Sequence, residues 1–259
     1  MSLSSKTLLA LGLVLFMLGQ GARAELRIDI TQGTAKAVPI AVVPFLDPPS
    51  GKPAIDVAKL IGSDLGRTGR FAPIPESDML QKPTKGTEVD FGDWRILGTE
   101  VVIVGRVLDG SDGKYTIQFQ VFDAFRGEQL LGYRLPTTRA NLRMSVHRVS
   151  DMIYEQITGI PGAAATRVAY VNVQGPVENR PYRLLMTDSD GENARVIMES
   201  KEPIMSPSWS PDGRKLVYVS FENQNSQIYV QVLRTGARKR VSARKGVNSA
   251  PSWSPDGRM

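Results

Sequence analysis

The chain has 259 residues, of which 41% are hydrophobic and 22% are charged, and its formal net charge is +6. These proportions are ordinary for a globular protein, so they exclude a disordered or collagen-like chain. The absence of cysteine excludes a disulfide scaffold, thiolate nucleophiles, cysteine-based metal sites and a lipid anchor on cysteine. The length allows one large domain or two modest ones.

Residues 1–24 have the features of a cleaved export signal. Lys6 precedes the apolar run 7–19, and Ala22-Arg23-Ala24 offers a small-x-small cleavage pattern. A membrane anchor is the alternative, but an apolar run of about 13 residues is shorter than the roughly 20 that cross hydrocarbon. We therefore expect cleavage after Ala24, a location outside the cytoplasm, and a mature chain without an integral membrane span. Loss of Lys6 and Arg23 would lower the net charge from +6 to +4.

Residues 38–160 show the hydrophobic periodicity of an α/β domain, in which strands and helices alternate. The predicted strands are 38–45, 71–74, 101–107, 115–122 and 129–135, and the predicted helices are 55–65, 90–97 and 142–157. Asp90 is expected to cap the second helix. The stretch 115–122 alternates in period two and is followed by a turn, so it predicts a hairpin with 129–135.

Helical spacing ends at Pro161-Gly162, and residues 161–165 are a predicted linker. Between 166 and 259 we expect only antiparallel strands. The predicted strands are 167–173, 182–188, 194–198, 216–221, 227–233 and 239–242. Turn-forming residues at 188–191 and 234–236 separate them.

The second half also contains a repeat, because the segment 206–214 returns as 250–258 after 44 residues. This period is typical of four-stranded propeller blades. The shared positions are Trp209, Pro211, Asp212, Gly213, Trp253, Pro255, Asp256 and Gly257. The tryptophans would pack between sheets and the Pro-Asp-Gly residues would form turns. The two aspartates could instead be ligands or catalytic acids, but turn formation explains every residue of the motif.

The predicted propeller is incomplete. Residues before Arg167 lack the tryptophan motif that precedes Lys215, so we expect the first blade to lack its innermost strand. About 97 residues follow Gly162, whereas four to eight blades would need roughly 180 to 350. The fold class we predict is therefore an α/β domain followed by an all-β, incomplete β-propeller of about two blades, from a C-terminally truncated chain.

Enzyme signatures are sparse. The sequence contains no G-x-S-x-G elbow, H-E-x-x-H motif, Walker A loop or dinucleotide-binding glycine pattern. His147 is the only histidine; it lies beside the apolar stripe of the predicted helix 142–157, where we interpret it as a helix-flank residue rather than a catalytic base. We predict no enzymatic activity, catalytic residue, cofactor or metal. The basic residues between 234 and 245 lack interleaved aromatics, so a solvated surface is favoured over nucleic-acid binding.

Residues 25–33 alternate apolar and polar side chains and would become the N-terminus after signal cleavage. Such a strand could complete its hydrogen bonds on the sheet edge of another protein. From the pattern alone, pairing with the chain's own sheet is favoured slightly.

These features together resemble the TolB family of the Tol-Pal system of Gram-negative bacteria. The residues that carry the resemblance are the mature start E-L-R-I-D-I-T-Q-G, the run PIAVVPF, and the S-x-S-W-S-P-D-G-R-K-L-V-Y repeat. The likeness extends over essentially all mature residues. It implies a non-enzymatic periplasmic adaptor with a propeller of about six blades in the intact family.

The resemblance also implies partners. A Pal-like outer-membrane lipoprotein would bind the propeller, and a TolA-like inner-membrane protein would bind the N-terminal strand, within a partner-binding segment 25–37. The strand residues are Glu25, Leu26, Arg27, Ile28, Asp29, Ile30, Thr31, Gln32 and Gly33, and the Pal-like loop is Gly246, Val247, Asn248, Ser249 and Ala250. The implied roles are outer-membrane integrity, envelope constriction at cell division, and import of some colicins.

An alternative function stays open at this point. Similar repeats occur in propeller-bearing peptidases, so the chain could be the propeller portion of an exported prolyl-oligopeptidase-like hydrolase whose catalytic domain is missing. Further tryptophan repeats downstream would favour the adaptor, whereas a G-x-S-x-G elbow would favour the hydrolase.

Overall fold

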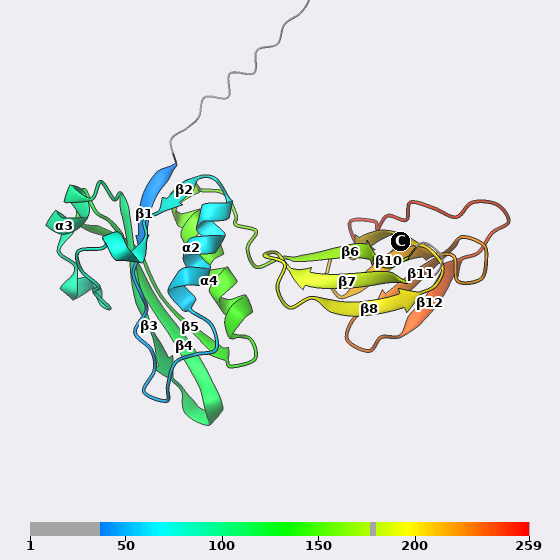
Figure 1. Cartoon of the computed structure of the whole chain (residues 1–259), viewed down its shortest axis with the longest axis horizontal. Coiled ribbons are helices and arrows are strands. Elements are labelled where there is room, and N and C mark those ends of the chain that lie inside the picture. The colour runs from blue at the N-terminus through cyan, green and yellow to red at the C-terminus, as the bar shows by residue number, and fades with distance from the viewer. Residues whose placement is uncertain (1–36, 177–179, 259) are drawn as a thin grey trace, which may run out of the picture. The chain divides into compact units, whose positions relative to one another are not determined.

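A mixed five-stranded sheet forms the first half of the computed structural model, which describes residues 37–176 and 180–258 (Figure 1). The elements of this half are β1 (Val38–Val42), α2 (Val57–Arg67), β2 (Phe71–Pro73), η1 (Glu76–Asp78), η2 (Gly86–Glu88), α3 (Phe91–Ile96), β3 (Val101–Asp109), η3 (Ser111–Gly113), β4 (Lys114–Asp123), β5 (Glu128–Thr138) and α4 (Leu142–Thr158). All three predicted helices and all five predicted strands are therefore present.

The strand order in this sheet is β2-β1-β3-β4-β5. β1 runs parallel to both β2 and β3, whereas β3, β4 and β5 are antiparallel neighbours. The β4–β5 pairing confirms the predicted hairpin. β1 is shorter than the predicted strand 38–45 because Pro44 has no N–H for the ladder, and only Leu46 returns to the sheet through a bridge with Arg106.

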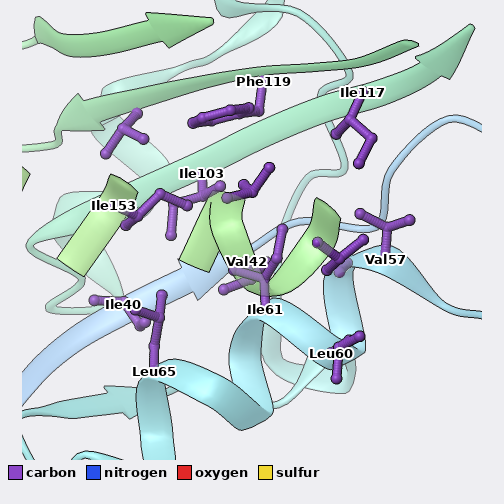
Figure 2. Packing of buried hydrophobic residues seen from close by; sticks show 14 of the residues in the cluster. Ile40, Val42, Val57, Leu60, Ile61, Leu65, Ile103, Ile117, Phe119 and Ile153 are labelled. Atoms are coloured by element: carbon purple, nitrogen blue, oxygen red, sulfur yellow. The ribbon is translucent and has the colours of Figure 1, made fainter. Parts of the chain in front are cut away.

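Helices cover both faces of the sheet, with α2 and α4 on one side and α3 on the other (Figure 1). Alternate strand residues supply the two cores: Ile40 and Ile103 face α2 and α4, whereas Ala41 and Val102 pack with Trp94 of α3. Figure 2 shows the larger core, in which side chains from α2 and α4 pack against those from β1, β3 and β4. The central strand β3 is buried on both faces, which explains its continuous apolar run.

Local signals set the helix ends. The Asp56 carboxylate accepts from the N–H of Lys59 at 3.0 Å and caps α2. Asp90 accepts from the N–H of Gly92 at 2.8 Å, which confirms the predicted cap of α3. α4 ends at Gly159, whose φ of 71° is the left-handed conformation typical of a helix C-terminus.

Two antiparallel sheets form the second half. Their strands are β6 (Arg167–Val173), β7 (Tyr182–Asp188), β8 (Arg195–Ser200), β9 (Ile204–Trp209), β10 (Lys215–Ser220), β11 (Gln227–Val232) and β12 (Arg238–Ser242). The first sheet has the order β6-β7-β8 and the second has the order β12-β11-β10-β9. Within the described residues β6 pairs only with β7, so the first sheet has three strands there and no innermost fourth strand, as predicted. The fold class is thus an α/β domain followed by an incomplete β-propeller.

The strand β9 was not among the predicted strands. Pro207 lies within it, and proline is unfavourable in a central strand because it cannot donate to the ladder. β9 pairs only with β10 among the described strands, so it can accommodate this proline at an edge. Ser206 before the proline has φ of 52°, and the repeat partner Ala250 has φ of 49°. The two repeats therefore share a backbone conformation that is unusual outside glycine.

Candidate functional site

The repeat aspartates form turns in both copies. The Asp212 carboxylate accepts from the Ser210 hydroxyl at 2.6 Å and from the Arg214 N–H at 3.0 Å. Asp256 makes the same contacts with Ser254 and Arg258, at the same distances. The serine hydroxyl, followed by the arginine N–H, holds the pKa of each carboxyl below its usual value. These contacts confirm the turn interpretation.

The repeat tryptophans belong to the blades. Trp209 ends β9 and packs against the buried cluster that contains Leu184 of the first sheet and Leu216 of the second. The indole N–H of Trp253 donates to the backbone carbonyl of Ser208 in β9 at 3.2 Å. Tryptophan therefore joins the start of one repeat to the sheet of the repeat before it.

The loop 246–250, which we will call the Asn248 loop, follows the outermost strand β12. Asn248 is buried, with 6% of its surface exposed, whereas Val247 beside it is 86% exposed. The loop therefore presents an apolar side chain to solvent from a backbone that is anchored one residue away.

Hydrogen bonds account for this anchoring. The side-chain amide of Asn248 donates to the carbonyls of Ser226 at 3.0 Å and Arg244 at 2.8 Å. Its Oδ1 accepts from the Ser242 hydroxyl at 2.6 Å and from the Arg244 N–H at 3.1 Å. The N–H of Asn248 donates to the Ser226 hydroxyl at 2.8 Å. The loop is thus fixed to the β10–β11 connection, which lies 22 residues earlier.

The other predicted partner-binding segment, residues 25–33, lies outside the described residues. Its role stays a prediction.

The basic stretch between 234 and 245 is exposed on and around β12, as predicted for a solvated surface. One residue of this stretch forms an ion pair that the sequence did not predict: the Arg238 guanidinium donates to both carboxylate oxygens of Glu222, at 3.1 and 3.0 Å. The same guanidinium lies 4.3 Å from the ring centroid of Tyr229. Tyr218 is beneath this group, and its burial raises the pKa of the phenol to about 12. The Arg238 guanidinium therefore packs on the rings of Tyr229 and Tyr218.

The interpretation of His147 as a helix-flank residue is wrong. Its side chain is completely buried, and Nδ1 lies 2.7 Å from Oδ2 of Asp64. Periodicity could not reveal this contact, because the two residues are 83 positions apart.

The arrangement around His147 is not that of a serine nucleophile. The nearby Ser150 hydroxyl donates to Asp64 and lies 3.2 Å from the carbonyl oxygen of Val146, and the imidazole nitrogen Nε2 faces Asp190. A catalytic triad needs the opposite arrangement, in which the histidine accepts from the serine.

The described helices include none that is long and apolar enough to cross a bilayer.

The sheets and helices described above define an α/β domain joined to β-propeller blades. Residues 26–130 match the model of the TolB amino-terminal domain, and residues 154–259 match the model of the TolB beta propeller domain. The chain therefore belongs to the TolB family.

Individual relatives agree with this assignment. The Tol-Pal system protein TolB of Thioalkalivibrio sulfidiphilus is 46% identical over 245 residues, which cover 94% of this chain and 56% of that protein. The protein of the same name from Xanthomonas oryzae pv. oryzae is 47% identical over 246 residues, with the same coverage. The crystal structure of TolB from Acinetobacter baumannii superimposes with a TM-score of 0.76 at 36% identity, covering 86% of this chain and 53% of that one. The chain thus spans about half the length of the relatives it matches.

Proposed function

We propose that this chain is a non-enzymatic periplasmic component of the Tol-Pal system that acts as an adaptor between envelope proteins. Membership of the TolB family supports this proposal, since the relatives that cover most of the chain carry the name Tol-Pal system protein TolB. The match of residues 26–130 to a TolB amino-terminal domain favours the adaptor over the alternative hydrolase.

The proposed organisation has an export signal at 1–24, a partner-binding segment at 25–37, an α/β domain at 38–160, a linker at 161–165 and blades from 166. The five-stranded sheet is built from strands that precede α4 in sequence, and the other two sheets are built from strands that follow it. This supports the division between the α/β domain and the blades. In this arrangement the α/β domain and the first blade separate the two partner-binding regions in sequence.

The Asn248 loop is the observation that best supports an adaptor. A protein-binding surface benefits from an exposed apolar side chain on a backbone that is already ordered, because less conformational entropy is then lost on binding. Val247 and Asn248 provide these two properties side by side. We propose that a Pal-like lipoprotein contacts this loop.

The proposed partner of residues 25–33 is a TolA-like protein. The alternation of Leu26, Ile28 and Ile30 with polar residues suits addition of a strand to a partner's sheet edge, where main-chain hydrogen bonds supply affinity and alternate side chains set the register.

Binding measurements with two partners test the division of labour. The exported chain and a variant lacking residues 25–33 would be titrated with the soluble domains of a Pal-like and a TolA-like protein. We expect the deletion to abolish TolA binding and to leave Pal binding within about twofold, because the deleted segment lies far in sequence from the Asn248 loop. Equal loss of both would contradict the proposal.

A substitution tests the loop itself. Val247→Ser should weaken Pal binding about fivefold or more, because it removes an exposed apolar contact without touching the Asn248 hydrogen bonds. Val196→Ser is the matched control, since Val196 is 52% exposed on β8, away from the loop. Unchanged Pal affinity in Val247→Ser would refute the role of the loop, and turnover of peptide substrates by the purified chain would refute the non-enzymatic assignment.

A further inference from the structure

A cluster of charged side chains around the buried His147 joins the α/β domain to the first blade. Both parts belong to one compact unit. α2 supplies Asp64 and Arg67, and α4 supplies Arg143 and His147. Asp188 ends β7, and Asp190 lies in the turn that follows. We will call these six residues the His147 cluster.

On the α2 side the cluster is fully hydrogen-bonded. One carboxylate oxygen of Asp64 accepts from Arg67 at 2.5 Å, and the other accepts from Ser150 at 2.8 Å and faces Nδ1 of His147 at 2.7 Å. A carboxylate can only accept hydrogen bonds, so Nδ1 is the nitrogen that carries hydrogen. The second nitrogen, Nε2, is then the only position on the ring at which a proton is gained or lost.

On the blade side Nε2 of His147 points at another carboxylate. It lies 3.6 Å from Oδ2 of Asp190, in a buried position, and has no hydrogen-bond partner. Burial alone raises the pKa of the Asp190 carboxyl, but the Glu192 N–H, Arg143 and His147 together outweigh burial and hold the pKa below its usual value. Asp190 is therefore an acceptor and an anion. An unprotonated Nε2 places its lone pair against this anion, whereas a protonated Nε2 forms an ion pair with it.

We propose that protonation of His147 strengthens the attachment of the first blade to the α/β domain, so that this attachment is tighter at acidic than at alkaline pH. Protonation turns a contact between a lone pair and a carboxylate into a bridge from Asp64 through the imidazolium to Asp190. The bridge is present while the ring is charged and is lost when Nε2 gives up its proton at higher pH.

The charged groups that face His147 are Asp64 and Arg67 of α2, Arg143 of α4, and Asp188 and Asp190 of the first blade, with Glu192 adjacent. Lys59 of α2 lines a cavity of about 500 Å³ together with Arg143, Asp190 and Glu192. Among these side-chain types, histidine is the one whose charge ordinarily changes near neutral pH.

A metal ion is a less suitable occupant. His147, Asp188 and Asp190 together could offer three ligand atoms. However, the guanidinium of Arg143 already contacts Asp190 and lies 3.9 Å from Asp188, so a cation occupies the place that a metal would take. Protonation of Nε2, unlike binding of a metal ion, does not require Arg143 to move.

Two measurements on the complete chain test the proposal. Imidazole nitrogen shifts report the protonation of His147 without ambiguity, because the chain has one histidine. Hydrogen exchange of the 189–192 turn amides between pH 6 and 8, corrected for intrinsic rates, reports the attachment of the blade. We expect protection of the turn to fall about fivefold as the ring loses its proton, a ratio that corresponds to ~1 kcal/mol.

Paired variants separate the histidine from the arginine. Asp190→Asn should lower protection and abolish its pH dependence, because the partner of Nε2 is gone. Arg143→Gln removes the other contact of Asp190; it should lower protection at every pH yet keep the dependence. A wild-type turn whose protection stays constant while the ring titrates would overturn the proposal, as would an equal pH dependence in Asp190→Asn. Zinc that restores protection at pH 8 would also overturn it, in favour of a metal site.

Discussion

The hydroxyl of Tyr218 donates to Oε1 of Gln231 at 2.8 Å, and both side chains are buried. Nε2 of Gln231 in turn donates to the carbonyl of Ile197 at 3.2 Å. Tyr218 and Gln231 belong to the second blade and Ile197 belongs to β8 of the first. A chain of two hydrogen bonds therefore crosses from one blade to the next inside an otherwise apolar core.

Tyr218→Phe should lower the free energy of unfolding by about 1 to 2 kcal/mol, because it leaves the buried Gln231 oxygen without its donor. Thermal or urea unfolding measures the change. Tyr133→Phe is the matched control, since Tyr133 is 48% exposed on β5 and loss of its hydroxyl should change stability by less than about 0.5 kcal/mol. Equal effects of the two substitutions would show that the blade contact contributes no stability.

Two glycine-to-alanine substitutions in the α/β domain should change the free energy of unfolding in opposite directions. A Cβ at Gly105 in β3 would clash with the Phe45 ring and lie 2.6 Å from the backbone carbonyl of Gln118, so Gly105→Ala should destabilise by about 2 to 3 kcal/mol. At Gly62 in α2 the nearest atoms would be 3.9 Å away, so Gly62→Ala should stabilise by up to about 1 kcal/mol. Urea midpoints that move in the same direction for both would contradict the packing of the sheet.

Low pH should destabilise the second blade because the Glu222 carboxylate becomes protonated. Burial raises the pKa of this carboxyl, but hydrogen bonds from Tyr229 and Arg238 outweigh burial and the net pKa is lowered. The resulting stabilisation is full above the unfolded-state pKa of about 4.3 and is lost as pH falls through the lower folded-state value. Glu222→Gln should therefore show a smaller loss of stability between pH 5 and pH 3 than the wild type.

The control for this pH series is Glu199→Gln. Glu199 also pairs with an arginine, Arg183, but its side chain is 52% exposed, and exposed ion pairs contribute little to stability. Its unfolding profile should stay close to that of the wild type. If Glu199→Gln and Glu222→Gln reduce the acid dependence equally, the partial burial of the Glu222–Arg238 pair has no energetic consequence.

Asn248→Ala should loosen the loop that carries Val247. The substitution removes the amide and carbonyl that bind Ser226, Ser242 and Arg244, at a cost of about 2 kcal/mol for the groups left unpaired. Amide exchange in residues 244–250 should accelerate while exchange in α4 is unchanged. Val247→Ser, which leaves these bonds in place, should exchange as the wild type does. Acceleration in Val247→Ser would contradict the anchoring role of Asn248.

Much of this fold could be predicted from the sequence because the signals are local. The apolar spacing of 142–157 predicted α4, Asp90 predicted the cap of α3, and the repeated Pro-Asp-Gly predicted turns that depend on side chains within two residues of the aspartate. The comparison of the two repeats also predicted that the first sheet, as far as the described residues show, has three strands instead of four. In each case the residues that decide the conformation are neighbours along the chain.

The sequence by itself determined the helices, the hairpin and the repeat with its turns, and only the tertiary structure decided which distant groups meet. β9 forms despite Pro207 because β10 offers it an edge position, a property of the sheet rather than of the segment. His147 is buried because α2 places Asp64 against it, 83 residues away in sequence. Hydrogen bonds between residues a few positions apart follow from the local sequence. Burial and ion pairing depend on how whole helices and strands pack, and the hydrophobic periodicity of one element does not indicate which distant residue it will contact.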